Sequence, residues 1–121
     1  MLSVMMYLSL FYLERIAIYL KIFFKNKPWL PVNDDMAERL QQELVKELSR
    51  EHVLYGTKAQ AIAKREDNDD VVFWISAIEQ YAIVHLTYAQ ETSKIFPITK
   101  LFSAEELEEY CKHIFQYYER E

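Results

Sequence analysis

The chain has 121 residues, of which 51% are hydrophobic and 15% aromatic, and this composition excludes an intrinsically disordered protein. A chain of this length is typical of one domain with one core. Its formal net charge of −5 argues against a nucleic-acid-binding protein, because nucleic acid phosphates bind to basic surfaces.

Residues 1–24 are dominated by hydrophobic side chains and are long enough to cross a bilayer, which takes about 20 residues. Glu14 and Arg15 lie near the middle of this segment, where each charge costs about 2.5–3.5 kcal/mol in a membrane. Three interpretations fit: a helix packed on the domain, an interfacial anchor in which residues 1–27 contact a membrane, or an extension outside the domain. The segment up to Pro31 carries a net charge of +3, so the remainder carries −8.

The Pro28-Trp29-Leu30-Pro31 sequence ends the predicted N-terminal helix, since each proline disfavours helical geometry in the residue before it. We interpret it as a linker. The sequence then predicts residues 1–31 as a hydrophobic helix with its linker, and residues 32–121 as a single α+β domain.

An amphipathic helix is predicted from about Asp34 to Ser49, because Asn33 can cap its start and leucines recur every four residues. After it comes Gly56, the only glycine in the sequence, which suggests a backbone position with positive φ or a close approach.

Three strands are expected next, over Lys58–Arg65, Val71–Ile75 and Tyr81–Tyr88, and they form an antiparallel meander with the second strand in the centre. The last two strands carry hydrophobic residues at both alternating parities. A strand with one face in water would alternate, so both faces of this pair are expected to be covered.

A fourth, edge-type strand is possible over Ile95–Phe102, with Pro97 inside it. Ser103 and Glu106 then form a capping box that starts a C-terminal helix. The expected fold is α+β, with a three- to four-stranded antiparallel sheet. Its two amphipathic helices are expected to share one sheet face, and the N-terminal helix could cover the other.

The nearest group to an acid–base set is His85 with Asp70, joined by Asp69 and Glu91. In a meander the aspartates lie near the end of the neighbouring strand, where Asp70 could orient His85 as a general base. The sequence places no serine or cysteine nucleophile beside His85, which favours a structural role. The three histidines and the lone Cys111 lack metal-ligand spacing, so neither a metal nor a cofactor is predicted.

Four aromatic residues are candidates for a binding surface, because tyrosine and tryptophan are enriched at protein interfaces. They are Trp74, Tyr88, Tyr117 and Tyr118.

Several short motifs lie between Asp35 and Glu109: Ala37-Glu38-Arg39-Leu40, Leu54-Tyr55-Gly56, Ala61-Ile62-Ala63-Lys64-Arg65, Asp69-Asp70-Val71, Ala82-Ile83-Val84-His85-Leu86-Thr87 and Pro97-Ile98-Thr99. Together they resemble a family of small, uncharacterised bacterial proteins. The resemblance implies a small bacterial α+β protein and carries over no catalytic residues. Residues 1–30 depart from it.

The leading expectation is a non-enzymatic protein-binding or accessory module, cytoplasmic, with a protein partner or a second copy of itself. An acidic immunity-like or inhibitor protein that neutralises a basic partner is one version. The alternatives are a small hydrolase-like enzyme with His85 as base and Asp70 as its orienter, and an accessory protein attached to the inner face of the membrane through residues 1–27.

Overall fold

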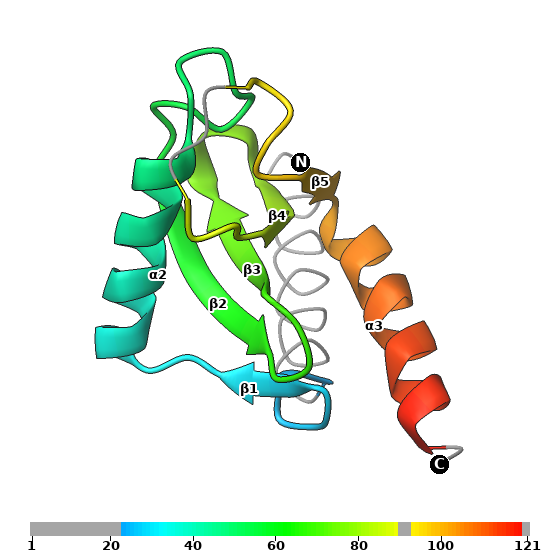
Figure 1. Cartoon of the computed structure of the whole chain (residues 1–121). Helices are drawn as coiled ribbons and strands as arrows, with labels where there is room; N and C mark the ends of the chain where they lie inside the picture. The colour runs from blue at the N-terminus through cyan, green and yellow to red at the C-terminus, as the bar shows by residue number, and fades with distance from the viewer. Residues whose placement is uncertain (1–22, 90–92, 120–121) are drawn as a thin grey trace, which may run out of the picture.

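The computed structural model describes residues 23–89 and 93–119. They form an α+β fold in which helices α2 (Asp34–Glu47) and α3 (Ala104–Glu119) pack on a five-stranded antiparallel sheet (Figure 1). The predicted fold class is confirmed. The hydrophobic helix predicted within residues 1–24 lies outside the described residues, apart from Phe23 and Phe24.

The sheet follows chain order, so each strand pairs with its neighbours in sequence and the third strand is central, as predicted. A single 3-10 turn, Ser76–Ile78, joins the central pair, and Glu79 after it has a φ of 51°. The strands are β1 (Trp29–Pro31), β2 (Ala59–Arg65), β3 (Asp70–Ile75), β4 (Gln80–His85) and β5 (Thr99–Phe102).

The interpretation as a linker is wrong for residues 29–31. They form edge strand β1, which pairs with β2 from Arg65 to Ala63. Prolines exclude a helix here, but they are tolerated on an edge strand because its outer N–H groups need no partner. Trp29 is 3% exposed and its ring lies 5.2 Å from that of Phe24. Residues before position 32 therefore contribute to the core.

Both helices begin at side-chain caps that the sequence indicates. The Asn33 side chain accepts a hydrogen bond from the backbone N–H of Met36 at 2.8 Å. At α3 the predicted capping box is present: the Ser103 N–H donates to Glu106 Oε1 at 2.9 Å, and the Glu106 N–H donates to Ser103 Oγ at 3.1 Å. These bonds, with the charge of Lys100, lower the pKa of Glu106.

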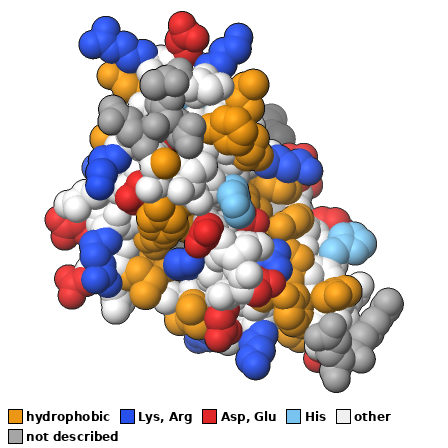
Figure 2. Space-filling model, viewed as in Figure 1, with side chains coloured by type: hydrophobic (Ala, Val, Ile, Leu, Met, Phe, Trp, Pro, Cys, Tyr) orange, Lys and Arg blue, Asp and Glu red, His pale blue; other side chains and the backbone are white. Residues whose placement is uncertain are grey.

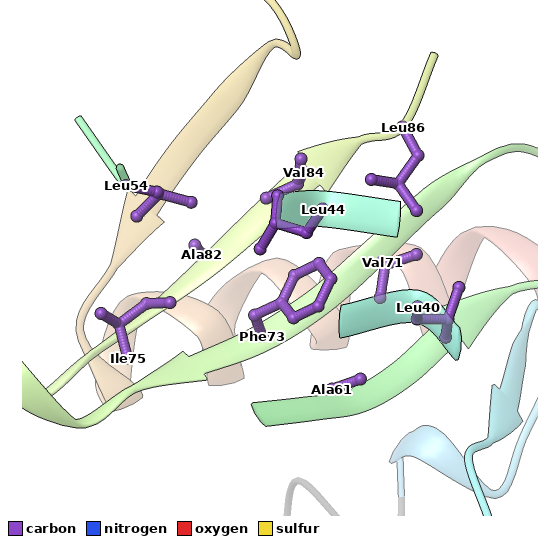
Figure 3. Packing of buried hydrophobic residues seen from close by; sticks show 10 residues of the cluster. All are labelled: Leu40, Leu44, Leu54, Ala61, Val71, Phe73, Ile75, Ala82, Val84 and Leu86. Carbon is purple, nitrogen blue, oxygen red and sulfur yellow. The ribbon is translucent and has the colours of Figure 1, made fainter. Parts of the chain in front are cut away.

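The two helices cover opposite faces of the sheet, which corrects the expectation that they share one. Leu40 and Leu44 of α2 pack over Phe73 on one face, and Figure 3 shows α3 behind the strands. On the other face Leu107 and Cys111 of α3 pack in a cluster with Trp29 and Phe24. The reason is the double parity of the central strands. Each face presents buried side chains, so each requires its own helix. The strand residues involved are Val71, Phe73, Ile75, Val84 on the α2 face and Val72, Ile83 on the α3 face.

Gly56 has a φ of +74°, and a Cβ built there would meet nothing within 4 Å. The glycine is thus required by backbone conformation rather than by a close approach. It lies in the loop of residues 48–58, which crosses the α2 face and buries Leu54 completely.

Candidate functional site

The two predicted acid–base residues are direct cross-strand partners. Asp70 begins β3, His85 ends β4, and the antiparallel register sets them opposite each other. Asp70 Oδ1 lies 2.8 Å from His85 Nδ1, while the His85 side chain is 52% exposed and the Asp70 side chain 19%. A carboxylate in this position orients the ring and leaves Nε2 available.

His85 and Asp70 line a shallow pocket of about 180 Å³ on the α3 face. Burial raises the pKa of Tyr110, so this hydroxyl stays protonated at neutral pH. None of the lining side chains is a serine, threonine or cysteine. The arrangement can hold a proton but offers no conventional nucleophile beside the base. The other lining residues are Ile83, Ile98, Lys100 and Phe102.

Tyr118, predicted as a binding residue, is held by an ion pair at the far end of α3. Arg65 Nη2 lies 2.7 Å from Asp67 Oδ2, and the Tyr118 hydroxyl donates to the same carboxylate. The Arg65 guanidinium lowers the pKa of Asp67 to about 2. Neighbouring Tyr117 is 62% exposed and its ring lies 5.5 Å from that of Tyr118.

The other two aromatic candidates have different surroundings. Trp74 lies partly buried against Tyr81, with ring centroids 4.8 Å apart, so it does not form an open patch. Tyr88 is 53% exposed and has a φ of 55°, which is uncommon for a tyrosine.

Glu47 holds the backbone at Tyr88 in that conformation. This carboxylate is fully buried, accepts from the Thr87 N–H at 2.7 Å and Thr87 Oγ1 at 2.9 Å, and accepts from the Tyr88 N–H at 2.9 Å. Its hydrogen bond with Glu43, one helical turn earlier, raises the pKa of Glu43. Glu91, the remaining acid–base candidate, lies outside the described residues.

A different surface lies at the β5 side of the sheet, in residues 93–102, which we call the edge segment. Three hydrophobic side chains are open to solvent there: Ile95 is 60% exposed, Phe96 42% and Ile98 49%. Such side chains close together in the chain are uncommon on a monomer surface and mark contact sites.

The edge segment is fixed to the 48–58 loop by a buried histidine. His52 Nδ1 accepts the Leu54 N–H at 3.0 Å, so the proton must lie on Nε2, which donates to the Pro97 carbonyl at 3.0 Å. Ser49 Oγ donates to the Ser93 carbonyl at 3.4 Å. The 48–58 loop and the edge segment therefore lie side by side, and the loop holds the edge segment in place (Figure 1).

One edge of β5 has no strand beside it in the described part of the chain. The His85 N–H donates to the Ile98 carbonyl, and antiparallel pairing alternates, so Ile98, Lys100 and Phe102 bond to β4. Thr99 and Leu101 consequently direct their N–H and C=O groups away from the sheet.

The two segments at this edge are rich in basic residues although the chain is acidic. Residues 48–58 and 93–102 contain Arg50, Lys58, Lys94 and Lys100 against one acid, Glu51. Lys100 Nζ lies 5.4 Å from the centre of the Phe102 ring. Figure 2 shows hydrophobic side chains gathered at the upper right of the molecule, with Lys and Arg side chains near them.

Within residues 23–89 and 93–119 no group of three or more His, Cys, Asp or Glu side chains could hold a metal ion. No helix in those same ranges has the length and hydrophobicity needed to cross a membrane. Comparison of the chain with family models, with curated proteins and with solved structures finds no match.

Sequence reasoning missed Glu47 and the open edge. Glu47 follows Leu40 and Leu44 at the spacing of the buried stripe, which is the signal that could have found it. Pro97 did indicate an edge strand, but exposure of Ile95, Phe96 and Ile98 depends on what packs beside them.

Proposed function

We propose that this protein is a non-enzymatic binding module that docks another protein on the edge segment, residues 93–102. The observation that supports this most is the coincidence of an unpaired strand edge with exposed Ile95, Phe96 and Ile98. An unpaired strand edge is a template for pairing with another chain, and β5 offers a short one of four residues.

The edge segment is also pre-organised for binding. His52 and Ser49 tie it to a loop whose Leu54 is fully buried, so its conformation does not depend on the partner. A surface ordered beforehand loses less conformational entropy on association, which favours affinity.

A basic partner was expected from the net charge of −8 that the residues after Pro31 carry. The segments at this edge are rich in basic residues, so a basic partner would have to use another surface.

A capture experiment tests the docking site. Full-length wild-type protein, an Ile95→Asp/Ile98→Asp variant and a Val45→Asp variant are immobilised and exposed to native lysate. Val45 on α2 is 69% exposed, so the same change there is a matched control away from the edge.

We expect a partner that is retained by the wild type and by Val45→Asp and lost with the double variant. Equal retention by all three proteins would contradict the proposal. Circular dichroism establishes that each variant is folded, since exposed substitutions usually change stability by under about 0.5 kcal/mol.

A second candidate is a hydrolase-like activity with His85 as general base, supported by its 2.8 Å contact with Asp70 beside a pocket. Water would have to be the nucleophile, because the pocket supplies no hydroxyl or thiol suited to attack. His85→Gln should abolish any hydrolytic activity found for the chain, and retention of that activity would exclude this role.

A further inference from the structure

We infer that the partner presents an extended segment that adds to the sheet beside β5, with the pattern hydrophobic–x–acidic–x–hydrophobic. This inference rests on the proposed function and specifies its chemistry.

The backbone supplies a short hydrogen-bonding edge with defined ends. Thr99 and Leu101 each offer an outward N–H and C=O, because their neighbours Ile98, Lys100 and Phe102 bond to β4. Pro97 has no N–H, and its carbonyl is already bonded to His52. The Ser103 N–H donates to Glu106. An added strand therefore gains about four backbone hydrogen bonds, in the manner of β-augmentation.

The side chains of β5 dictate which residues fit opposite. Ile98, Lys100 and Phe102 alternate on the α3 face, and residues opposite them on an added strand alternate in the same way. Hydrophobic side chains suit the positions opposite Ile98 and Phe102. An acidic side chain suits the position opposite Lys100. The pattern reads the same in both directions, so it holds for a parallel or an antiparallel partner.

The charge around the edge supports the acidic position. Arg50, Lys58, Lys94 and Lys100 give this end of an acidic molecule a local positive charge. The Lys100 ammonium is exposed and lies over the Phe102 ring. Its charge interacts with that of Glu106 at the start of α3, but no ion pair joins Lys100 to a carboxylate among the described residues. A carboxylate opposite it would gain attraction and meet no acid in the edge segment.

A second copy of the chain fits this edge poorly. Symmetric antiparallel pairing centred on Lys100 sets two lysines directly opposite each other. Centring on Thr99 sets Leu101 opposite Pro97, which lacks an N–H. Centring on Leu101 sets Thr99 opposite Ser103, whose N–H is already bonded to Glu106. Each register therefore either loses backbone hydrogen bonds or places two lysine charges in repulsion.

Synthetic peptides test the pattern on the full-length protein. The test peptide has two valines flanking a central glutamate at alternate positions, with threonines between and outside them. One control has lysine in place of glutamate. A second control has the glutamate exchanged with the adjacent threonine, which moves the charge to the other face of the strand. Binding is measured by calorimetry with wild type, Lys100→Glu and Arg39→Glu.

The test peptide should bind the wild type at least about threefold more tightly than either control, as expected for a favourable pair exchanged for an unfavourable one. Lys100→Glu should reverse the preference between glutamate and lysine peptides. Arg39→Glu should retain it, because Arg39 is exposed on α2 and lies outside the edge segment. On binding, hydrogen exchange should slow at the Thr99 and Leu101 amides, and Lys100 and Phe102 should change little.

Two outcomes would overturn the inference. In one, the peptides bind alike or not at all, or the Thr99 and Leu101 amides gain no protection from exchange. Retention of the captured partner would still depend on Ile95 and Ile98. The docking site would then stand without strand addition. In the other, the chain forms a dimer in sedimentation that protects those two amides, so a second copy occupies the edge.

Discussion

The imidazole of His52 joins the 48–58 loop to the edge segment, with its Nε2 donating to the Pro97 carbonyl at 3.0 Å while its Nδ1 accepts from Leu54. The ring is 5% exposed, so both of its nitrogens are satisfied within the protein. Because the ring bridges two loops that have no regular secondary structure, it sets the position of residues 93–98 relative to the sheet.

Replacing His52 by Ala should destabilise the fold by about 1–3 kcal/mol, since it leaves the buried Leu54 N–H without a partner and the Pro97 carbonyl with the Thr99 hydroxyl alone. Urea unfolding measures this loss. His113→Ala is the control, because the His113 side chain is 74% exposed and pairs with Glu109, whose side chain is itself 67% exposed. That control should change stability by under about 0.5 kcal/mol. Equal effects of both substitutions would show that His52 does not fix the loop.

Replacing Glu47 by Gln should cost about 2–3 kcal/mol, because an amide group would face N–H and O–H donors that now share a carboxylate. Glu43→Gln should be close to neutral at pH 7, since it removes a carboxyl that hydrogen-bonds to Glu47 and has a raised pKa. Chemical denaturation of both variants checks the difference. A neutral Glu47→Gln would mean that the buried carboxylate does not hold the Thr87–Tyr88 backbone.

The elements themselves could be predicted from local patterns. The Asn33 and Ser103 caps, the central strand and its double parity each follow from residues close together in the sequence. The placement of α2 and α3 on opposite faces could not be read in this way, because it depends on how each connection crosses the sheet. Strand β1 was not predicted, because Pro28 before it and Pro31 within it are typical of a linker.

In the candidate site, too, some features follow from local sequence and others depend on long-range packing. The contact between Asp70 and His85 follows from antiparallel register, which the turn between their strands fixes. The open edge of β5 depends on long-range packing, since a hydrophobic run before a strand is buried in most folds. No sequence pattern distinguishes Ile98, which is exposed, from Ile83, which is 8% exposed.

Stability should fall as the pH drops from about 4 to about 2 through the ion pair of Asp67 and Arg65. The pKa of Asp67 is lowered from 3.8 to about 2 in the folded chain, so the unfolded chain binds more protons in this window. The contribution is fully present above the unfolded pKa and is lost as the pH passes through the folded one. Since 38% of the Asp67 side chain is exposed, screening limits it to about 1 kcal/mol.

Thermal unfolding of wild type and Asp67→Asn as a function of pH checks this contribution. The curves should converge below about pH 2 and separate above pH 4. Tyr118→Phe, which removes the hydroxyl donated to Asp67, should give an intermediate curve. Parallel curves over the whole range would show that the pair does not contribute.

Cys111 should be unreactive toward thiol reagents in the folded protein. It is 1% exposed beneath the sheet, and burial raises its pKa to about 12, so little thiolate exists at pH 8. A colorimetric disulfide reagent should label it only in denaturant. Full labelling in native buffer within minutes would indicate that α3 does not stay packed on the sheet.

Residue-resolved amide hydrogen exchange of the free protein tests most directly whether β5 presents an unpaired edge. The alternation of backbone bonds predicts fast exchange at Thr99 and Leu101 and slow exchange at Lys100 and Phe102, whose N–H groups bond to β4. Slow exchange at all four amides in the free monomer would contradict the account, since the edge would then already be covered.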